Sequence, residues 1–281
     1  MTAYSHPETL VSTDWVKQNL NTPGVRIVEI DVDTKAYDAG HIPGAVGLNW
    51  ETELQDQVSR DIVGKDAFEA LMRTVGISNS DHVVLYGDNN NWFAAYGFWL
   101  FKMYGHENVS LMNGGRNKWL NEDDKELTPA PPAVRPSDYR VAKVDHALRA
   151  KVPDVLAIAQ SKAANLVDVR SPDEFSGKVI APPGMTETAQ RGGHVPGAKS
   201  IPWSRTVNAD GTFKSADDLR QIYFKDAGLK DNTPTVCYCR IGERSSHSWF
   251  VLKYLLGVKD CRNYDGSWTE YGSMVGVPIE R

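Results

Sequence analysis

A six-residue stretch occurs twice in this chain with almost the same letters. Residues 40–45 read GHIPGA and residues 193–198 read GHVPGA, an offset of 153 positions (194 minus 41). The match continues through both halves, because Tyr86 and Gly105 stand 152 positions before Tyr238 and Gly257. Repetition over this length constrains the fold more than any single motif does, and it predicts two copies of one structural unit.

Each copy alternates short apolar runs with longer amphipathic stretches. Residues 27–31 and 83–86 in the first copy, and 166–170 and 235–238 in the second, have the length and composition of buried strands. Alternation of strands and helices predicts an α/β protein of two tandem three-layer domains, each with a mainly parallel sheet flanked by helices. Ligand sites in such domains lie at the carboxyl ends of the strands.

A Pro-rich segment sets the predicted domain boundaries. Residues 128–136 contain four prolines, so this stretch has few backbone donors and should run extended along the surface. We therefore expect a first domain at 1–127, a linker at 128–143 and a second domain at 144–281.

Charge and cysteine content exclude several classes of protein. The 281 residues include 31 Lys and Arg against 36 Asp and Glu, a formal charge of -5, so no basic surplus is available for binding nucleic acid. The most apolar run, residues 92–101, is too short to cross a bilayer, and no membrane partner is expected. Three cysteines, an odd number, favour a reducing compartment, and the cytoplasm is the expected location.

The two copies differ in the loop after the second predicted strand. In the second copy Cys239 directly follows the strand, whereas the first copy has Gly87 at that position. A helix is predicted to begin near Ser245 or Ser246, so backbone NH groups of the loop and of the first helical turn should converge near Cys239. With Arg240 and Arg244 in the same loop, we expect the pKa of the Cys239 thiol to be lowered, which makes Cys239 the candidate nucleophile.

These motifs together resemble a known family. GHI/VPGA early in each copy, DGSW at 265–268 and the loop pattern Cys-Arg-x-Gly-x-Arg are similar to the rhodaneses. The resemblance covers nearly the whole chain and implies a first rhodanese-like domain without the catalytic cysteine and a catalytic second domain. It further implies that Cys239 takes a sulfane sulfur from thiosulfate, holds it as a persulfide and passes it to cyanide or another thiophile. The acceptor could also be a dithiol or a protein, and no cofactor is expected.

The loop also bears on the sulfur donor. Thiosulfate-type members of the family have a basic loop, whereas mercaptopyruvate-type members have a smaller and less charged one, so Arg240 and Arg244 favour thiosulfate over 3-mercaptopyruvate. A dianion also gains more than a monoanion from two guanidinium groups. Ile241 departs from this pattern, because some thiosulfate enzymes have a lysine there. Arg191, in an insertion between Phe175 and His194, is the candidate replacement. The predicted substrate-binding residues are Arg240, Gly242, Arg244 and Arg191.

Other residues are weaker candidates for supporting roles. Asp168 ends a predicted strand and either orients the loop or caps a turn, and Trp203 is a candidate cleft residue. His247 either tunes the thiolate or has a surface or capping role. Cys237 is predicted to pack in the core, and His41 and His194 occur in both copies and are expected to have a shared structural role. Ile241 and Glu243 complete the set of supporting candidates, and no metal site is predicted.

Two other functional classes remain open at this stage. A cysteine phosphatase or arsenate reductase also holds an oxyanion on a loop between strand and helix, but phosphatases place five residues between Cys and Arg, and here four separate Cys239 from Arg244. The narrower loop favours a single added sulfur atom. A non-catalytic binding module is the alternative for the first copy.

Overall fold

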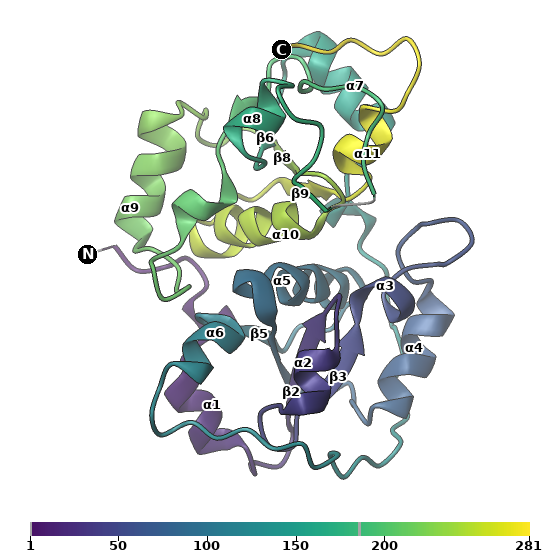
Figure 1. Cartoon of the computed structure of the whole chain (residues 1–281), viewed down its shortest axis with the longest axis vertical. Helices are drawn as coiled ribbons and strands as arrows, with labels where there is room; N and C mark the ends of the chain where they lie inside the picture. Colours follow the sequence, from purple (N-terminus) through teal and green to yellow (C-terminus); the bar gives the residue numbers. More distant parts are fainter. Residues whose placement is uncertain (1, 185–186) are drawn as a thin grey trace. The chain divides into compact units, whose positions relative to one another are not determined.

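The computed structural model describes residues 2–184 and 187–281 and separates into two compact units. The unit called here the first domain contains Glu8–His146 and Ala209–Thr212. The second domain contains the other described residues, including residues 2–7. Each domain corresponds to one copy of the repeat, and each has its own sheet (Figure 1).

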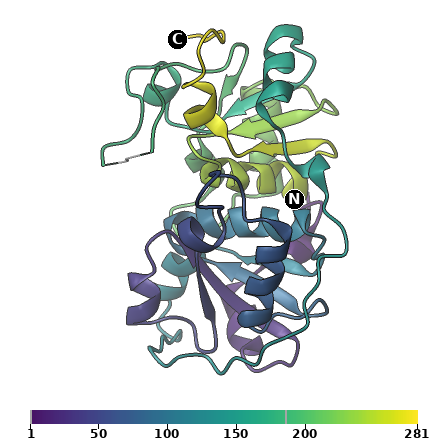
Figure 2. The same ribbon diagram turned by 90° about the vertical axis from the view of Figure 1, so that its right-hand side faces the viewer.

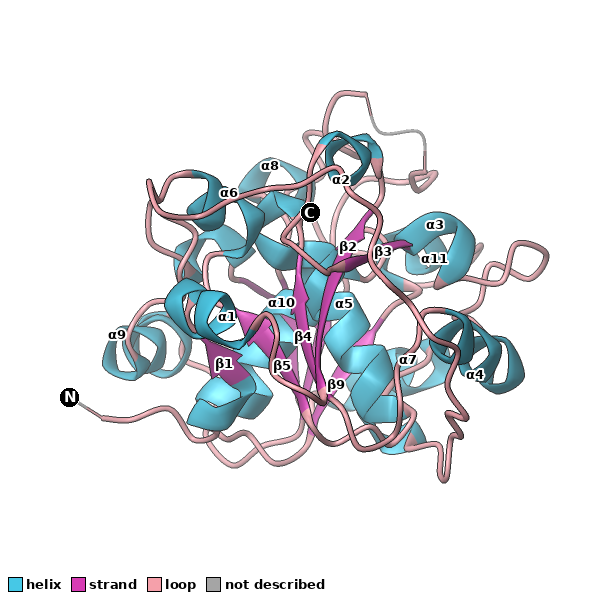
Figure 3. Cartoon of the chain, turned by 90° about the horizontal axis from the view of Figure 1, so that it is seen from below, coloured by secondary structure: helices cyan, strands magenta, loops and turns pink. Residues whose placement is uncertain are grey.

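The first domain has a five-stranded sheet in the order β1-β5-β4-β2-β3, and all pairs are parallel. Figure 3 shows the strands side by side with helices on both sides. Its elements are β1 (Leu10–Val11), α1 (Thr13–Asn19), β2 (Val25–Asp31), α2 (Lys35–Ala39), β3 (Val46–Asn49), α3 (Trp50–Glu53), α4 (Lys65–Thr74), β4 (His82–Tyr86), α5 (Asp88–Met103), β5 (Val109–Met112) and α6 (Gly115–Leu120), after a short helical turn η1 (Pro7–Thr9).

The second domain has a four-stranded parallel sheet in the order β7-β6-β8-β9, again between helices (Figure 2). A parallel bridge between Arg149 and Asn263 takes the edge position that β1 has in the first domain. Its elements are η2 (His146–Leu148), α7 (Val152–Ser161), β6 (Asn165–Asp168), α8 (Pro172–Phe175), β7 (Lys199–Ser200), η3 (Trp203–Thr206), α9 (Ala216–Arg220), η4 (Gln221–Asp226), β8 (Thr235–Tyr238), α10 (Glu243–Phe250), η5 (Val251–Leu255), β9 (Cys261–Tyr264) and α11 (Ser267–Tyr271).

Equivalent strand positions face equivalent cores in the two domains. Val84 and Tyr86 of β4 pack with residues of α1 and α6, and Val236 and Tyr238 of β8 pack with residues of α7 and α11. Successive side chains of a strand point to opposite faces, so this shared alternation requires the same register in both copies. The predicted tandem α/β architecture with parallel sheets is confirmed.

A buried carboxylate beside the central strand is neutralised by an arginine in both domains, but the arginine comes from different positions. In the first domain, Arg116 of α6 donates to Glu29 at 2.7 Å and also to the Gly40 carbonyl. In the second domain, Arg170 donates to Asp168 at 2.7 Å and to the Gly193 carbonyl at 2.7 Å. The position equivalent to Arg116 (116 plus 152) is Trp268, whose ring lies 4.6 Å from the Arg170 guanidinium.

The ends of the domains differ from the boundaries predicted from the Pro-rich segment. Residues 128–143 contain no helix or strand, yet they are held along the first domain, for example by the bond from Ser137 N to Arg73 O at 3.1 Å. The division between the domains falls after His146. Ser5 N and His6 N donate to the carbonyls of Leu255 and Tyr254, both at 2.9 Å, and thereby satisfy acceptors that the end of η5 leaves open. None of the described helices is long and apolar enough to cross a bilayer.

Candidate active site

Cys239 lies at the carboxyl end of β8, directly before the loop that leads into α10. The helix begins at Glu243, two or three residues earlier than predicted, because Gly242 takes a backbone φ of +105° that allows the chain to turn directly into the helix. A Cβ at Gly242 would also lie 3.0 Å from Asp265 Cα. Both the backbone angle and the available space therefore require glycine at this position.

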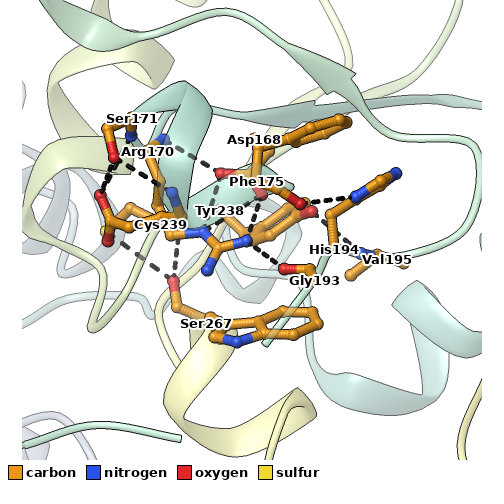
Figure 4. Close-up of polar contacts among 12 residues, drawn as sticks. Asp168, Arg170, Ser171, Phe175, Gly193, His194, Val195, Tyr238, Cys239 and Ser267 are labelled. Carbon is orange, nitrogen blue, oxygen red and sulfur yellow. Dashed lines mark hydrogen bonds and ion pairs between the residues drawn. The ribbon is translucent and has the colours of Figure 1, made fainter. Parts of the chain in front are cut away.

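The sulfur of Cys239 lies among polar groups. Gly242 N donates to Sγ at 3.1 Å, and the thiol donates to Glu243 Oε2 at 3.3 Å. Ser267, at the start of α11, accepts from Cys239 N at 3.0 Å, and its Oγ lies 4.0 Å from Sγ; Figure 4 shows Ser267 directed toward Cys239. The side chain of Cys239 is fully buried, but its surroundings are hydrogen-bonding groups and not an apolar core.

Three polar side chains hold the loop between Cys239 and α10 in place. Ser245 Oγ and Ser246 Oγ both donate to the Gly242 carbonyl, at 3.0 and 2.7 Å. Ser245 Oγ also lies 2.6 Å from Asn263 Oδ1, and Asn263 Nδ2 donates to Ser246 Oγ at 2.9 Å. These buried groups satisfy one another, which fixes the loop that carries Cys239.

The pKa of the Cys239 thiol is raised, so the prediction of a lowered pKa is wrong for this arrangement. Burial is the largest cause, and the Glu243 carboxylate adds to it. The Arg244 guanidinium and the NH groups of Gly242 and Ser245 act in the opposite direction. The positive charges of the loop do not act alone on the thiol, because the carboxylates of Glu243 and Glu174 accompany them.

Both loop arginines are engaged by acceptors of the protein itself. Arg244 forms two bonds with Glu174 of α8, at 3.0 and 3.1 Å, and its Nε lies 3.5 Å from Glu243 Oε1. Arg240 donates to the Glu187 carbonyl, and its Nη2 lies 3.9 Å from Glu243. Ile241 between them is buried. The positive charges of two arginines and the negative charges of two carboxylates therefore neutralise one another beside Cys239.

Glu174 and Ser267 are the site residues that the sequence analysis missed. Ser171 caps α8 by accepting from Glu174 N, and the Glu174 carboxylate accepts from Ser171 N in return. This capping box is visible in the sequence as a Ser followed three residues later by a Glu. It indicates where the helix starts, but not that the carboxylate pairs with Arg244. Ser267 belongs to the DGSW motif, which was read only as a mark of the family.

Asp168 and Arg170 form a buried ion pair beside Tyr238 (Figure 4), and the Arg170 guanidinium lies 6.0 Å from the centre of the Tyr238 ring. Asp168 Oδ1 also accepts from Arg170 N at 3.0 Å, which fixes the turn after β6. This contact fixes the end of β6, and whether Asp168 also orients the Cys239 loop stays a prediction.

His247 is fully buried against Phe213 and Trp203, with ring centroids 4.7 and 5.7 Å apart. Among the described residues its ring nitrogens have no hydrogen-bond partner, and burial lowers its pKa to about 3. His247 is thus a neutral packing residue in this structure, so the surface role is wrong. Trp203 is half-buried beside it.

His41 and His194 have the shared structural role that their repetition predicts. His41 stacks on Tyr37 with centroids 4.0 Å apart, and His194 stacks on Phe175 at 3.6 Å. In each case the ring Nδ1 contacts the carbonyl of that same aromatic residue, at 3.0 and 2.8 Å.

Arg191 lies where main-chain carbonyls occupy its guanidinium. It donates to Gly272 O at 3.1 Å, Val277 O at 3.3 Å and Tyr271 O at 3.4 Å, and also to Met274 O. These acceptors lie at or after the end of α11, where carbonyls lack partners within the helix. A contact of Arg191 with substrate stays a prediction, and the structure supplies a competing structural role.

The three cysteines are free and buried. Cys237 alternates with Tyr238 on β8 and faces the opposite side of the sheet from the Tyr238 core. In the part of the chain that the structure describes, no group of three or more His, Cys, Asp or Glu side chains is placed to hold a metal ion.

Comparison with known proteins agrees with this geometry. Residues 12–122 and 152–274 match the family described as "Rhodanese-like domain". The chain belongs to this family, as a tandem pair of its domains, and the resemblance read from the sequence is confirmed.

Individual relatives cover nearly the full length. A protein of Saccharopolyspora erythraea named "Putative thiosulfate sulfurtransferase" is 56% identical over 277 residues, which is 98% of this chain and 97% of that protein. "Sulfur carrier protein TtuD" of Thermus thermophilus is 53% identical over 283 residues, 99% of this chain and 98% of that protein. The crystal structure of SseA from Escherichia coli, described as a 3-mercaptopyruvate sulfotransferase with the rhodanese fold, has a TM-score of 0.80 at 27% identity and covers 92% of this chain and 98% of SseA. These relatives support sulfurtransferase as the enzyme class.

Proposed function

We propose that this protein moves a sulfane sulfur from thiosulfate to a thiophilic acceptor through a persulfide on Cys239. The observation that carries the proposal is the position of Cys239 Sγ at the start of a strand-to-helix loop, 3.1 Å from Gly242 N. Backbone NH groups directed at one point stabilise negative charge that develops there. A persulfide anion on Cys239 has such a charge.

The reaction needs no cofactor. The sulfur of Cys239 attacks the outer sulfur of thiosulfate, the S–S bond of thiosulfate breaks, and sulfite leaves with the bonding electron pair. A thiophile, such as cyanide or a thiol, then attacks the outer sulfur of the persulfide and regenerates the Cys239 thiol. Because Cys239 is fully buried, a neighbouring side chain must move before a donor reaches it.

Thiosulfate treatment is expected to increase the protein mass by one sulfur atom. The Cys239→Ser variant should take up no sulfur. The Cys237→Ser variant, which lacks the thiol on β8 itself, should take up sulfur as the wild type does. Intact-protein mass spectrometry before and after cyanide treatment measures both loading and release. Loss of uptake in Cys237→Ser, with uptake retained in Cys239→Ser, would overturn the assignment.

A second donor, 3-mercaptopyruvate, is favoured by one observation. The positive charge of Arg244 is balanced by Glu174 and that of Arg240 faces Glu243, so the attraction for a dianion is weaker than the sequence suggests. The similarity to SseA is consistent with this alternative. Steady-state kinetics with both donors decides between them.

Arg240 is the better arginine to test, because removing Arg244 would leave the buried Glu174 without its partner. For Arg240→Ala we expect kcat/KM with thiosulfate to fall about tenfold or more, since a charge-assisted hydrogen bond contributes about 1.5–3 kcal/mol. The loss with 3-mercaptopyruvate should be smaller. Arg205→Ala, at a partly exposed arginine paired with Asp226, is the control. Equal losses with both donors would count against thiosulfate recognition by Arg240.

The acceptor and the compartment are proposed on separate grounds. The name of the Thermus thermophilus relative describes a sulfur carrier, which supports a protein or a dithiol as the acceptor in addition to cyanide. Three free cysteines are typical of a reducing compartment, and we place the protein in the cytoplasm on that basis.

A further inference from the structure

Glu243 has no role in the reaction as described so far. This residue is 2% exposed, and its Oε2 is the acceptor for the Cys239 thiol at 3.3 Å. It begins α10, where the helix dipole and the free NH groups favour a negative charge. This carboxylate is therefore both stabilised by its position and in direct contact with the reacting sulfur.

The charge of Glu243 acts against a permanently ionised Cys239. It is the second cause, after burial, of the raised pKa of this thiol. An anion next to the sulfur destabilises a thiolate, because two adjacent negative charges repel each other. The contact is favourable when the thiol keeps its proton and donates a hydrogen bond to the carboxylate.

The first domain supplies an internal comparison. The position equivalent to Cys239 is Gly87, and the position equivalent to Glu243 is Asn91 (243 minus 152). Asn91 Oδ1 accepts from Gly87 N at 3.1 Å, and its Nδ2 donates to Met112 O at 2.7 Å. A neutral amide thus satisfies the backbone where no thiol is present, and the carboxylate occurs in the copy that has the thiol.

We propose that Glu243 is the proton acceptor for Cys239 during sulfur loading, an inference that rests on the proposed function. As Cys239 Sγ forms its bond to the outer sulfur of thiosulfate and sulfite leaves with its electron pair, the thiol proton moves to Glu243 Oε2. The neutral carboxyl group then stands beside the anionic persulfide and donates a hydrogen bond to it. When the acceptor removes the outer sulfur, the proton returns to Cys239.

The charged groups around this pair come from four segments of the second domain. Arg240 and Arg244 lie at 3.9 and 3.5 Å from Glu243 Oε1, and Glu174 reaches the pair through Arg244. Asp265, which packs on Gly242, is neutralised by Arg149 in two bonds at 2.7 and 2.8 Å. Protonation of Glu243 leaves one unbalanced positive charge near the sulfur, which favours the persulfide anion.

The pH dependence of sulfur loading tests the proton transfer. In the wild type, one proton shared by Cys239 and Glu243 is sufficient for loading, so the single-turnover rate with thiosulfate should stay nearly constant through neutral pH and fall only at acidic pH. In Glu243→Gln, a side chain of the same shape that cannot accept the proton, loading should follow thiolate formation and rise about tenfold per pH unit. General base catalysis contributes roughly 10²–10⁴-fold, so at pH 6 we expect the variant to load at least tenfold more slowly.

A second readout separates this loss from a merely structural one. The ultraviolet absorbance of the thiolate should show Cys239 ionising at lower pH in Glu243→Gln, because a negative charge has been removed from its side. More thiolate with slower loading at pH 6 is a combination that misfolding of the loop would not produce. In Glu243→Ala, added acetate or formate should restore part of the loading rate.

Glu174→Gln is the matched control, since this carboxylate also contacts Arg244 but receives the Ser171 donors instead of the thiol. Its rate can change, but the shape of its pH profile should match that of the wild type. A wild type that takes up no sulfur from thiosulfate would overturn the proposed function and this inference with it. A wild type that loads sulfur, with a Glu243→Gln profile of the same shape, would overturn the inference alone.

Discussion

At the scale of single residues, several charges near the site serve the fold before they serve a substrate. Arg191 donates to four carbonyls at or after the end of α11, and the Arg191 carbonyl in turn accepts from Trp268 Nε1 at 2.9 Å. Arg244 is bound to Glu174. An arginine in a candidate site is therefore evidence for substrate binding only when its donors are not already used by the protein.

Arg191→Ala tests this distinction. Removing the guanidinium leaves partly buried carbonyls without this donor, and we expect the free energy of unfolding to fall by about 1–3 kcal/mol. The KM for thiosulfate should stay within about twofold of the wild-type value, because the Arg191 donors already serve main-chain carbonyls. Urea unfolding and steady-state kinetics on the same preparation measure the two quantities. A large rise in KM at unchanged stability would instead support the predicted substrate role of Arg191.

At the scale of elements, the sequence predicts the strand positions well and the helix starts less well. Residues 235–238 form a short, mostly apolar run, which predicts a buried strand, and the structure has β8 at those positions. The predicted start of α10 is too late because Glu243 and Arg244 are assigned to the loop that follows Cys239, although both residue types favour a helix. In the structure the left-handed φ of Gly242 and the acidic Glu243 form the first turn.

The electrostatic balance of the site could not be predicted from the loop itself. Glu174 is 70 residues from Arg244, and only the packing of α8 against α10 brings them together. The burial that raises the pKa of Cys239 is likewise a property of the folded domain. Local sequence thus indicates which residue is the candidate nucleophile, but the protonation state of that residue depends on long-range contacts.

At the scale of the whole molecule, the two copies keep one fold while exchanging charged positions. Glu29 and Asp168 are equivalent, and so are Asp31 and Arg170 (both 139 apart). Arg170 pairs with Asp168 in the second domain, whereas in the first domain the arginine comes from position 116. The first domain therefore has a carboxylic acid, Asp31, at the position where the second domain has the arginine that neutralises Asp168.

Because of this exchange the first domain contains a buried carboxyl group, Asp31, that has no arginine partner of its own among the described residues. We expect it to make the stability of the first domain depend on pH. Asp31 is 3% exposed, and Oδ2 has no hydrogen-bond partner in the described part of the chain. Burial, followed by the charge of Asp88, raises the pKa of Asp31 to about 9. The folded chain thus retains this proton at neutral pH, whereas an unfolded chain releases it near pH 4.

The sign of the resulting effect follows from proton linkage. The folded state binds the extra proton between about pH 4 and pH 9, so raising the pH through this range favours the unfolded state and lowers the free energy of unfolding. Asp31→Asn removes the ionisation and keeps an acceptor for Asp88 N, which Asp31 Oδ1 now serves at 2.7 Å. We expect the variant to be more stable than the wild type by about 1–3 kcal/mol at pH 8, and equally stable at pH 4. Urea unfolding at both pH values measures the difference, with Asp33→Asn at an exposed neighbour as control. A wild type and an Asp31→Asn variant of equal stability at pH 8 would show that the folded chain bears the Asp31 charge without penalty.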